Sequence, residues 1–212
     1  MPSGRGADTR RRMLEVAERQ FAQKGYQGTH LESIAREVGV RKTALYYYFE
    51  SKSALYTAVL DRMSIELDRV VGGALGHPEL GHVQRLKQLT GDLNALFARN
   101  LNYSQILLRI FVDRIPLSDD SVLTPSIESA MVSVMAFYRE GKQAGVFRGL
   151  SARHFMVSLL GMSIFFYAGR ESSARMLDVA DVAAPESVSW RDKELRSLLL
   201  HGVLKHADSP AS

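Results

Sequence analysis

Residues 29 to 52 constrain the fold more than any other segment of this chain, because they predict two short helices joined by a tight corner. Apolar side chains recur at positions 31, 34, 35 and 38, which is the spacing of one face of a helix. Gly39 follows at the point where a chain leaving a helix needs a left-handed residue. A second helix is expected from Lys42 to Phe49, so the pair forms a helix-turn-helix unit.

The first helix of the pair also carries a start signal. Thr29 is followed three residues later by Glu32, which is the spacing of a capping box. In that arrangement the threonine hydroxyl accepts a hydrogen bond from a backbone N–H of the first turn. The sequence therefore predicts that Thr29 caps a helix running from Leu31 to Val38.

The second helix presents tyrosines and cations where a buried helix would present apolar side chains. If Leu45 and Phe49 face the core, Tyr47 lies almost opposite them at about 100° per residue. Ser51 is expected to cap a following helix whose first turn carries Lys52, within reach of a phosphate. A helix with one buried side and tyrosines and cations on the other is typical of one that lies in a DNA groove. The alternative interpretation of residues 29 to 52 is a surface helical hairpin that happens to be rich in tyrosine.

Motifs spread over about residues 9 to 60 resemble those of one family. Phe21–Tyr26, Thr29, Ile34–Ala35, Gly39–Val40 and Leu45–Lys52 resemble the N-terminal domain of TetR-family transcriptional regulators. The chain departs from the family pattern at Arg41, where a small serine is usual, and at Thr43-Ala44, where many members have Gly-Thr. Because alanine cannot donate a hydroxyl contact to phosphate, Arg41 is expected to supply a cation instead.

The spacing and the resemblance together assign eight residues to DNA. Base edges are expected to face Thr43, Tyr46 and Tyr47. Backbone phosphates are expected to contact Thr29, Arg41, Lys42, Tyr48 and Lys52. The resemblance further implies a homodimer that binds palindromic double-stranded DNA.

The excess positive charge lies in the same part of the chain. Residues 1 to 52 contain ten Lys and Arg and six Asp and Glu, whereas the remainder contains 17 of each kind. Clustered cations release counterions from DNA and supply affinity that is independent of base sequence. Arg10, Arg11 and Arg12 are therefore candidates for phosphate or minor-groove contacts, while Arg5 is better explained as part of a solvated tail.

Composition argues against several other classes of protein. The chain has no cysteine, which excludes disulfide frameworks and zinc–thiolate sites. It has no His-Glu-x-x-His pair, Gly-x-Ser-x-Gly elbow or phosphate-binding glycine loop, so we expect no enzyme, metal or cofactor. The longest apolar stretch, residues 155 to 169, is too short to cross a bilayer and no secretion signal is present, so we expect a cytoplasmic protein.

Helical periodicity predicts an all-α chain with a DNA-binding domain over residues 1–52 and a regulatory, ligand-binding and dimerisation domain over residues 53–212. About nine helices are expected, near residues 9–24, 31–38, 42–49, 52–71, 80–99, 104–115, 126–144, 151–168 and 190–206. The fourth should join the domains and stop at Gly72-Gly73. Residues 117–125 and 171–189 are expected to be loops, the second with a turn or two of helix.

Two C-terminal helices are expected to form the dimer. Helix 151–168 carries small residues that allow close approach, and helix 190–206 is apolar on nearly all sides. The resemblance implies that these helices form a four-helix bundle with their twofold mates, with Leu199 buried at the interface. Burial within one subunit is the alternative.

A small-molecule site is expected among polar or aromatic side chains inside the apolar helices. The candidates are Phe97, Tyr103, Arg109, Phe111, Asp113, Tyr138, Phe165 and Tyr167. Alternatively, the aromatic residues belong to the core, and Arg109 and Asp113 simply pair with each other. Because so few buried charges are available to neutralise a charged ligand, we expect a largely apolar effector.

These features predict a DNA-binding transcriptional regulator, specifically a repressor that a small, largely apolar ligand releases from its operator. An architectural or assembly DNA-binding protein without an effector is the alternative. In the ligand-controlled case, tilting helix 52–71 would change the distance between two recognition helices. That distance must be about 34 to 36 Å, or a multiple of it, for both to reach their half-sites.

Overall fold

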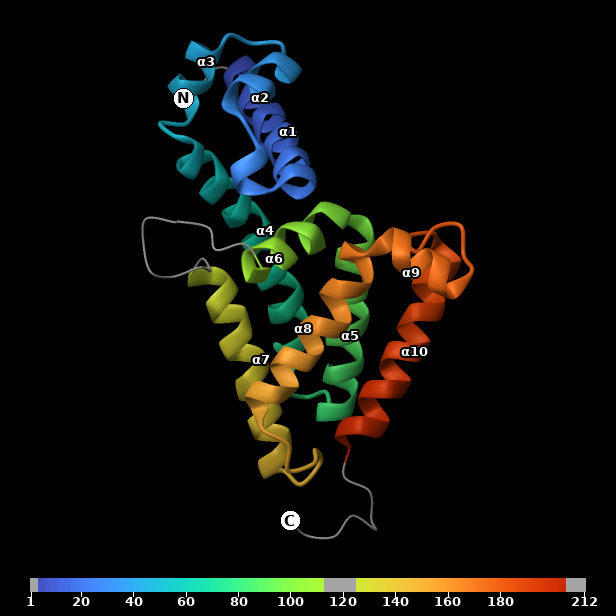
Figure 1. Ribbon diagram of the computed structural model, residues 1–212. Coiled ribbons are helices and arrows are strands. Elements are labelled where there is room, and N and C mark those ends of the chain that lie inside the picture. The colour runs from blue at the N-terminus through green and yellow to red at the C-terminus, as the bar shows by residue number, and fades with distance from the viewer. Residues whose placement is uncertain (1–3, 113–124, 205–212) are drawn as a thin grey trace.

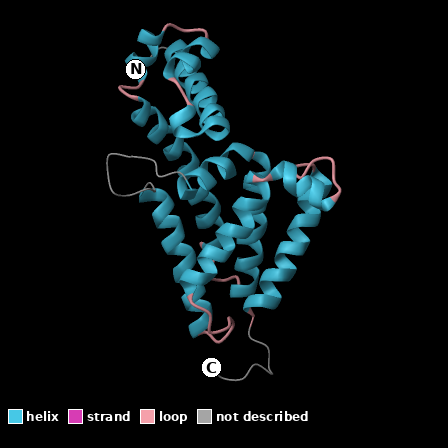
Figure 2. Ribbon diagram, viewed as in Figure 1, coloured by secondary structure: helices cyan, strands magenta, loops and turns pink. Residues whose placement is uncertain are grey.

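The structure is a computed structural model that describes residues 4–112 and 125–204, and every regular element in these ranges is an α-helix (Figures 1 and 2). The helices are α1 (Gly4–Gly28), α2 (Leu31–Val38), α3 (Lys42–Tyr48), α4 (Lys52–Leu75), α5 (His82–Arg99), α6 (Leu101–Val112), α7 (Pro125–Gln143), α8 (Ala152–Ala168), α9 (Arg170–Leu177) and α10 (Pro185–Val203). Within the same ranges, strand-like pairing is limited to one isolated bridge between Phe147 and Leu204. The predicted all-α class is confirmed.

The first three helices form a small bundle with the beginning of α4 (Figure 1). Phe21 of α1 lies in its core, with its ring centroid 4.8 Å from that of Tyr56 on α4. Leu45 and Phe49 are buried, as the helical spacing predicted. Gly25 has φ 72° and ψ 176°, so the regular geometry of α1 ends there, close to the predicted end.

The long helix α4 connects this bundle to the rest of the chain, packing against α1 as well as α5 and α7. Ser51 caps it as predicted, because its Oγ accepts a hydrogen bond from Ala54 N at 3.0 Å. The predicted stop at Gly72-Gly73 is wrong, since the helix continues to Leu75. A glycine inside a helix costs about 1 kcal/mol relative to alanine, and packing against α5 and α7 offsets that cost.

The remaining helices form a second, larger bundle. α4 packs on α5 and α7, α6 and α7 pack on α8, and α10 packs on α5 from the outside (Figure 1). α9 connects α8 to α10. None of the helices in residues 4–112 and 125–204 combines the length and the apolar character needed to cross a membrane.

Several helix boundaries in this bundle differ from prediction. α9 is the short helix of a turn or two that was expected within residues 171–189, whereas α10 begins at Pro185 instead of near Trp190. Proline suits the first position of a helix because it has no N–H to leave unpaired. α6 begins three residues earlier than expected, at Leu101. The predicted loop 117–125 lies almost entirely outside the described residues.

Candidate nucleic-acid interface and effector cavity

The corner between α2 and α3 has the geometry that the sequence predicted. Gly39 has φ 80° and ψ 31°, which is the left-handed conformation. Val40 N donates to Ala35 O at 2.9 Å, so the backbone group that leaves α2 is hydrogen-bonded. This corner fixes the direction in which α3 leaves α2.

Thr29 lies before this corner, but it does not cap α2. Its side chain is completely buried, and its hydroxyl lies 2.8 Å from Gly25 O and 3.1 Å from Gln20 O. His30 occupies the N-cap position and makes no side-chain cap bond. The capping-box prediction is therefore wrong, because carbonyls at the end of α1 engage the hydroxyl. The burial also contradicts the expected side-chain contact between Thr29 and phosphate.

The recognition-helix candidate α3 turns its tyrosines to the surface. Tyr47 is 84% exposed, and Tyr46 and Thr43 beside it are also exposed. Tyr48 is half-buried, with its ring centroid 5.2 Å from that of Tyr47 in an edge-on arrangement. Leu45 is buried on the opposite side of the helix, and its packing determines the side on which the tyrosines project.

Lys42, at the start of α3, already forms an ion pair within the protein. Its ammonium group donates to the carboxylate of Glu32 on α2 and lies 5.8 Å from the ring centroid of Tyr46. The hydrogen bond to Glu32 raises the pKa of Lys42, and the same bond lowers the pKa of Glu32. A phosphate at this position would therefore have to compete with Glu32 for the ammonium group.

Two further predicted phosphate contacts flank α3. Arg41 precedes the helix and is exposed. Lys52 lies beyond it, with its Nζ 4.5 Å from the ring centroid of Tyr26 and 3.4 Å from Gln27 O. Burial lowers the pKa of Lys52. Lys52 is thus held against the end of α1, on the same small bundle as α3.

The three consecutive arginines of α1 all have partners within the protein, and two of them contact other parts of the bundle. Arg11 pairs with Asp8 at 2.5 Å and with Glu15 at 2.8 Å. Arg12 donates to Val38 O at 3.2 Å, and the guanidinium of Arg10 lies 5.1 Å from the ring centroid of Phe49. These contacts give all three arginines a role inside the fold, so contact with DNA would be an additional one.

A polar cluster connects α1 to the larger bundle. The carboxylate of Glu18 pairs with Arg62 on α4 and accepts a hydrogen bond from Asn102 on α6 at 3.0 Å. Arg109 of α6 donates from Nε to Ala22 O and from a terminal nitrogen to Gln23 O, each at 3.0 Å. Arg109 was predicted to bind ligand, but it is turned toward α1 instead.

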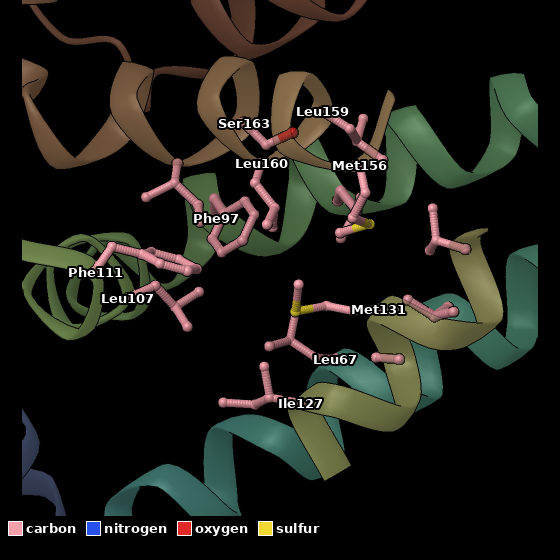
Figure 3. A pocket seen from close by; sticks show the side chains of 15 residues that line it. Leu67, Phe97, Leu107, Phe111, Ile127, Met131, Met156, Leu159, Leu160 and Ser163 are labelled. Atoms are coloured by element: carbon pink, nitrogen blue, oxygen red, sulfur yellow. The ribbon is translucent and has the colours of Figure 1, made fainter. Parts of the chain in front are cut away.

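An apolar cavity lies inside the larger bundle, between α4, α5, α6, α7 and α8 (Figure 3). Of the predicted ligand-binding residues, Phe97 and Phe111 line it. Figure 3 shows Met131 and Met156 extending toward one another from opposite walls. The lining side chains nearly fill the cavity, because the volume in which the centre of a water molecule fits is only about 50 Å³.

The other predicted ligand-binding residues lie elsewhere. Tyr138 donates to Arg148 O at 3.2 Å, and Tyr167 donates to Asn94 Oδ1 at 2.7 Å, so both hydroxyls are satisfied within the core. Tyr103 is buried next to the Glu18 cluster, and burial raises its pKa. Phe165 is exposed on α8, in a shallow groove outside the cavity. Asp113 lies outside the described residues.

Ser163 also lines the cavity, although the small residues of this helix were expected only to let another helix approach closely. It is 5% exposed, and its Oγ has no hydrogen-bond partner in the described part of the chain. Every other side chain lining the cavity is apolar. A single hydroxyl in the middle of an apolar helix was the signal that could have identified it.

The expected dimer helices expose apolar side chains on one side. Val157 and Phe165 are exposed on α8, and Trp190 and Leu198 on α10. The prediction that Leu199 lies at the interface is wrong, because Leu199 is 4% exposed in the single chain and α10 packs against α5, whereas Leu198 is 62% exposed.

Comparison with known proteins identifies the N-terminal segment. Residues 13–59 match the family model for bacterial regulatory proteins of the tetR family. The HTH-type transcriptional regulator RutR of Escherichia coli strain K12 is 56% identical over 48 residues, which is 23% of this chain and 23% of RutR. The biofilm operon icaADBC negative transcriptional regulator IcaR of Staphylococcus aureus strain Newman is 42% identical over 45 residues, 21% of this chain and 24% of IcaR.

The matched region thus spans about a quarter of the length of these curated relatives. The fold is similar over a much longer range. The ketosteroid transcriptional regulator KstR2 of Mycobacterium tuberculosis has a TM-score of 0.72 at 16% identity, over 93% of this chain and 95% of that chain. The matching family is one of regulators, in agreement with the expectation that this chain is not an enzyme. The N-terminal segment, residues 13–59, is therefore that of the TetR family of bacterial regulatory proteins, and the two helical bundles of the chain share their fold with KstR2.

Proposed function

We propose that this protein is a DNA-binding transcriptional regulator, in which residues 1–52 bind DNA and residues 53–212 dimerise and bind an effector. The observation that carries this proposal is α3, a short helix whose buried side is anchored by Leu45 while Tyr46 and Tyr47 project into solvent. A tyrosine that is 84% exposed adds little to the stability of the bundle beyond its edge-on contact with Tyr48. The same residue suits contact with base edges in the major groove.

The proposed contacts divide into those that select a sequence and those that position the protein. Thr43, Tyr46 and Tyr47 face the bases, and phosphates contact Arg41, Lys42, Tyr48 and Lys52. Thr29 acts indirectly, since its buried hydroxyl holds the end of α1 next to the start of α2. Lys42 exchanges Glu32 for a phosphate when the complex forms.

We further propose that the protein is a homodimeric repressor acting on a palindromic operator in the cytoplasm. The exposed apolar side chains of α8 and α10 support a two-chain helical interface. The description of IcaR as a negative regulator supports repression. Two recognition helices related by a twofold axis read two half-sites about 34 to 36 Å apart, or a multiple of that distance.

Release by a small apolar effector is supported by the connection between the cavity and α1. Leu107 and Phe111 of α6 line the cavity, while Arg109 between them contacts the end of α1. A ligand that displaces α6 therefore displaces the contacts that orient the DNA-binding bundle. The size of the effect equals the difference in ligand affinity between the two arrangements, and operator must weaken ligand binding by the same factor.

The central test compares two similarly exposed residues, one on the small bundle and one on the larger bundle. Sequencing the DNA retained by the purified protein gives the operator. Tyr47→Ala should then weaken operator binding by roughly 1–3 kcal/mol and random-duplex binding far less. Met176→Ala, an exposed side chain on α9, should leave both unchanged. Equal losses on operator and random DNA would contradict the base-reading role of Tyr47.

An architectural DNA-binding protein is the second candidate, and it would have no effector. A thermal-shift screen with lipophilic compounds separates the two, because a ligand that binds the native state raises Tm. A regulator of the proposed kind also loses operator affinity in the presence of the same compound. An architectural protein would show neither effect.

A further inference from the structure

The walls of the cavity restrict the chemistry of the molecule that can enter it. Within the described part of the chain, no charged side chain lines the cavity, and Ser163 supplies its single polar side chain. The nearest candidate for a counter-charge on α6, Arg109, is turned toward the carbonyls of α1. A buried ion without a partner costs several kcal/mol, so a charged ligand would be strongly disfavoured here.

The hydroxyl of Ser163 is the second restriction. Buried hydroxyls in proteins nearly always have a hydrogen-bond partner, and one that lacks a partner calls for an explanation. Ser163 Oγ has no partner in the described residues, although Ser173 and Ser104 elsewhere in the same bundle bond to backbone carbonyls. The Oγ atom is covered by its neighbours, so an oxygen atom on a bound molecule would satisfy it once the lining side chains have moved.

We propose that the effector is an uncharged, largely apolar molecule with one hydroxyl, carbonyl or ester oxygen that hydrogen-bonds to Ser163. This inference rests on the proposed function, because it concerns the effector of that regulator. It excludes free carboxylic acids in their ionised form, even when their hydrocarbon part fits. The single polar anchor sets the orientation of the molecule, and the remaining walls bind it by apolar contact.

The cavity has to expand when the effector binds. A bound ligand of ordinary size needs several hundred Å³, whereas about 50 Å³ is open to water centres in the described state. Met131 and Met156 face each other across the space, and their unbranched side chains can change rotamer at low cost (Figure 3). Binding therefore moves these methionines and presses on α6 through Leu107 and Phe111.

The test uses three probes with the same ten-carbon chain: 1-decanol, methyl decanoate and decanoate. Calorimetric titration at about pH 8 keeps decanoate ionised, since a carboxyl group has a pKa near 4. Wild type should bind the alcohol and the ester at least about ten times more tightly than the carboxylate. Equal or tighter binding of decanoate would overturn the proposal.

Substitution at the anchor identifies the site. Ser163→Ala should weaken 1-decanol binding by about 2- to 10-fold, the worth of one hydrogen bond. Ser133→Ala is the matched control, because that exposed serine on α7 bonds to Ser129 O outside the cavity and its loss should change nothing. Circular dichroism checks that both variants fold. An unchanged affinity of folded Ser163→Ala for 1-decanol contradicts the assignment.

Failure of this inference differs from failure of the proposed function. If wild type binds its operator but none of the three probes, the effector class is wrong and the DNA-binding role stands. If 1-decanol binds in a Ser163-dependent manner but no DNA is retained, the cavity assignment stands and the regulator proposal fails.

Discussion

Replacing Glu18 with glutamine should destabilise the protein and loosen the connection between its two bundles. The Glu18 side chain is 9% exposed and pairs with Arg62, whose side chain is 35% exposed. Removing one partner of a fully buried pair typically costs 3–5 kcal/mol. Because Arg62 is partly hydrated, and because glutamine can still accept the hydrogen bond from Asn102, we expect a loss of about 1–3 kcal/mol.

Glu15→Gln on the same helix is the control. Glu15 also pairs with an arginine, Arg11, but in an exposed arrangement four residues away, where an ion pair contributes only about 0.3–0.5 kcal/mol. Urea denaturation of both variants, with the slope m compared to confirm a common unfolded state, gives the difference. A loss for Glu18→Gln no larger than that for Glu15→Gln would show that the buried cluster does not hold the bundles together.

Three other perturbations test separate parts of the molecule. Lys52→Ala should weaken binding to operator and to random duplex by the same factor and reduce the slope of log K against log salt by about one, as measured by fluorescence anisotropy; a loss confined to operator would contradict a phosphate role. Leu198→Glu should give a folded monomer in light scattering, whereas Leu199→Glu should unfold the chain; a soluble Leu198→Glu dimer would place the interface elsewhere. Burial raises the pKa of Tyr167 to about 12, so above about pH 10 the unfolded chain loses this proton while the folded chain keeps it, and the free energy of unfolding falls. Tyr167→Phe should therefore flatten the decline of Tm from about pH 9 to 11. An unchanged decline would refute the raised pKa of Tyr167.

The DNA-binding bundle was predictable because its signals are local. The glycine corner and the positions of Leu45 and Phe49 determine which side of α3 is buried, and they lie within a dozen residues of each other. Thr29 is a case in which the local sequence pattern did not predict the hydrogen-bond partner. A threonine hydroxyl at this spacing suits a cap on α2 equally well, and only its burial against α1 directs it to Gly25 O.

The proposed effector site was less predictable than the helix-turn-helix, because the direction of a side chain depends on distant partners. Arg109 looked like a ligand anchor within an apolar helix, but its partner at Ala22 is 87 residues away in the sequence. Tyr167 is satisfied by Asn94, 73 residues away. Periodicity shows which helices are apolar, but it does not show which aromatic residue meets a cavity and which fills the core.

The glycine pair Gly72-Gly73 makes the C-terminal turn of α4 easier to deform than the long segment from Lys52 to Val71, because glycine restricts the backbone least. That long segment can act as a lever arm. Val71, which lines the cavity, directly precedes Gly72, and beyond the backbone of α4 itself there is open space beside both Gly72 and Gly73. From Val71 back to Lys52 the arm is about 28 Å long, so a tilt of about 5° at the cavity moves Lys52 by about 2.5 Å. A small tilt near the cavity would thus move Lys52, relative to a half-site of the proposed operator, by a distance comparable to the length of a hydrogen bond.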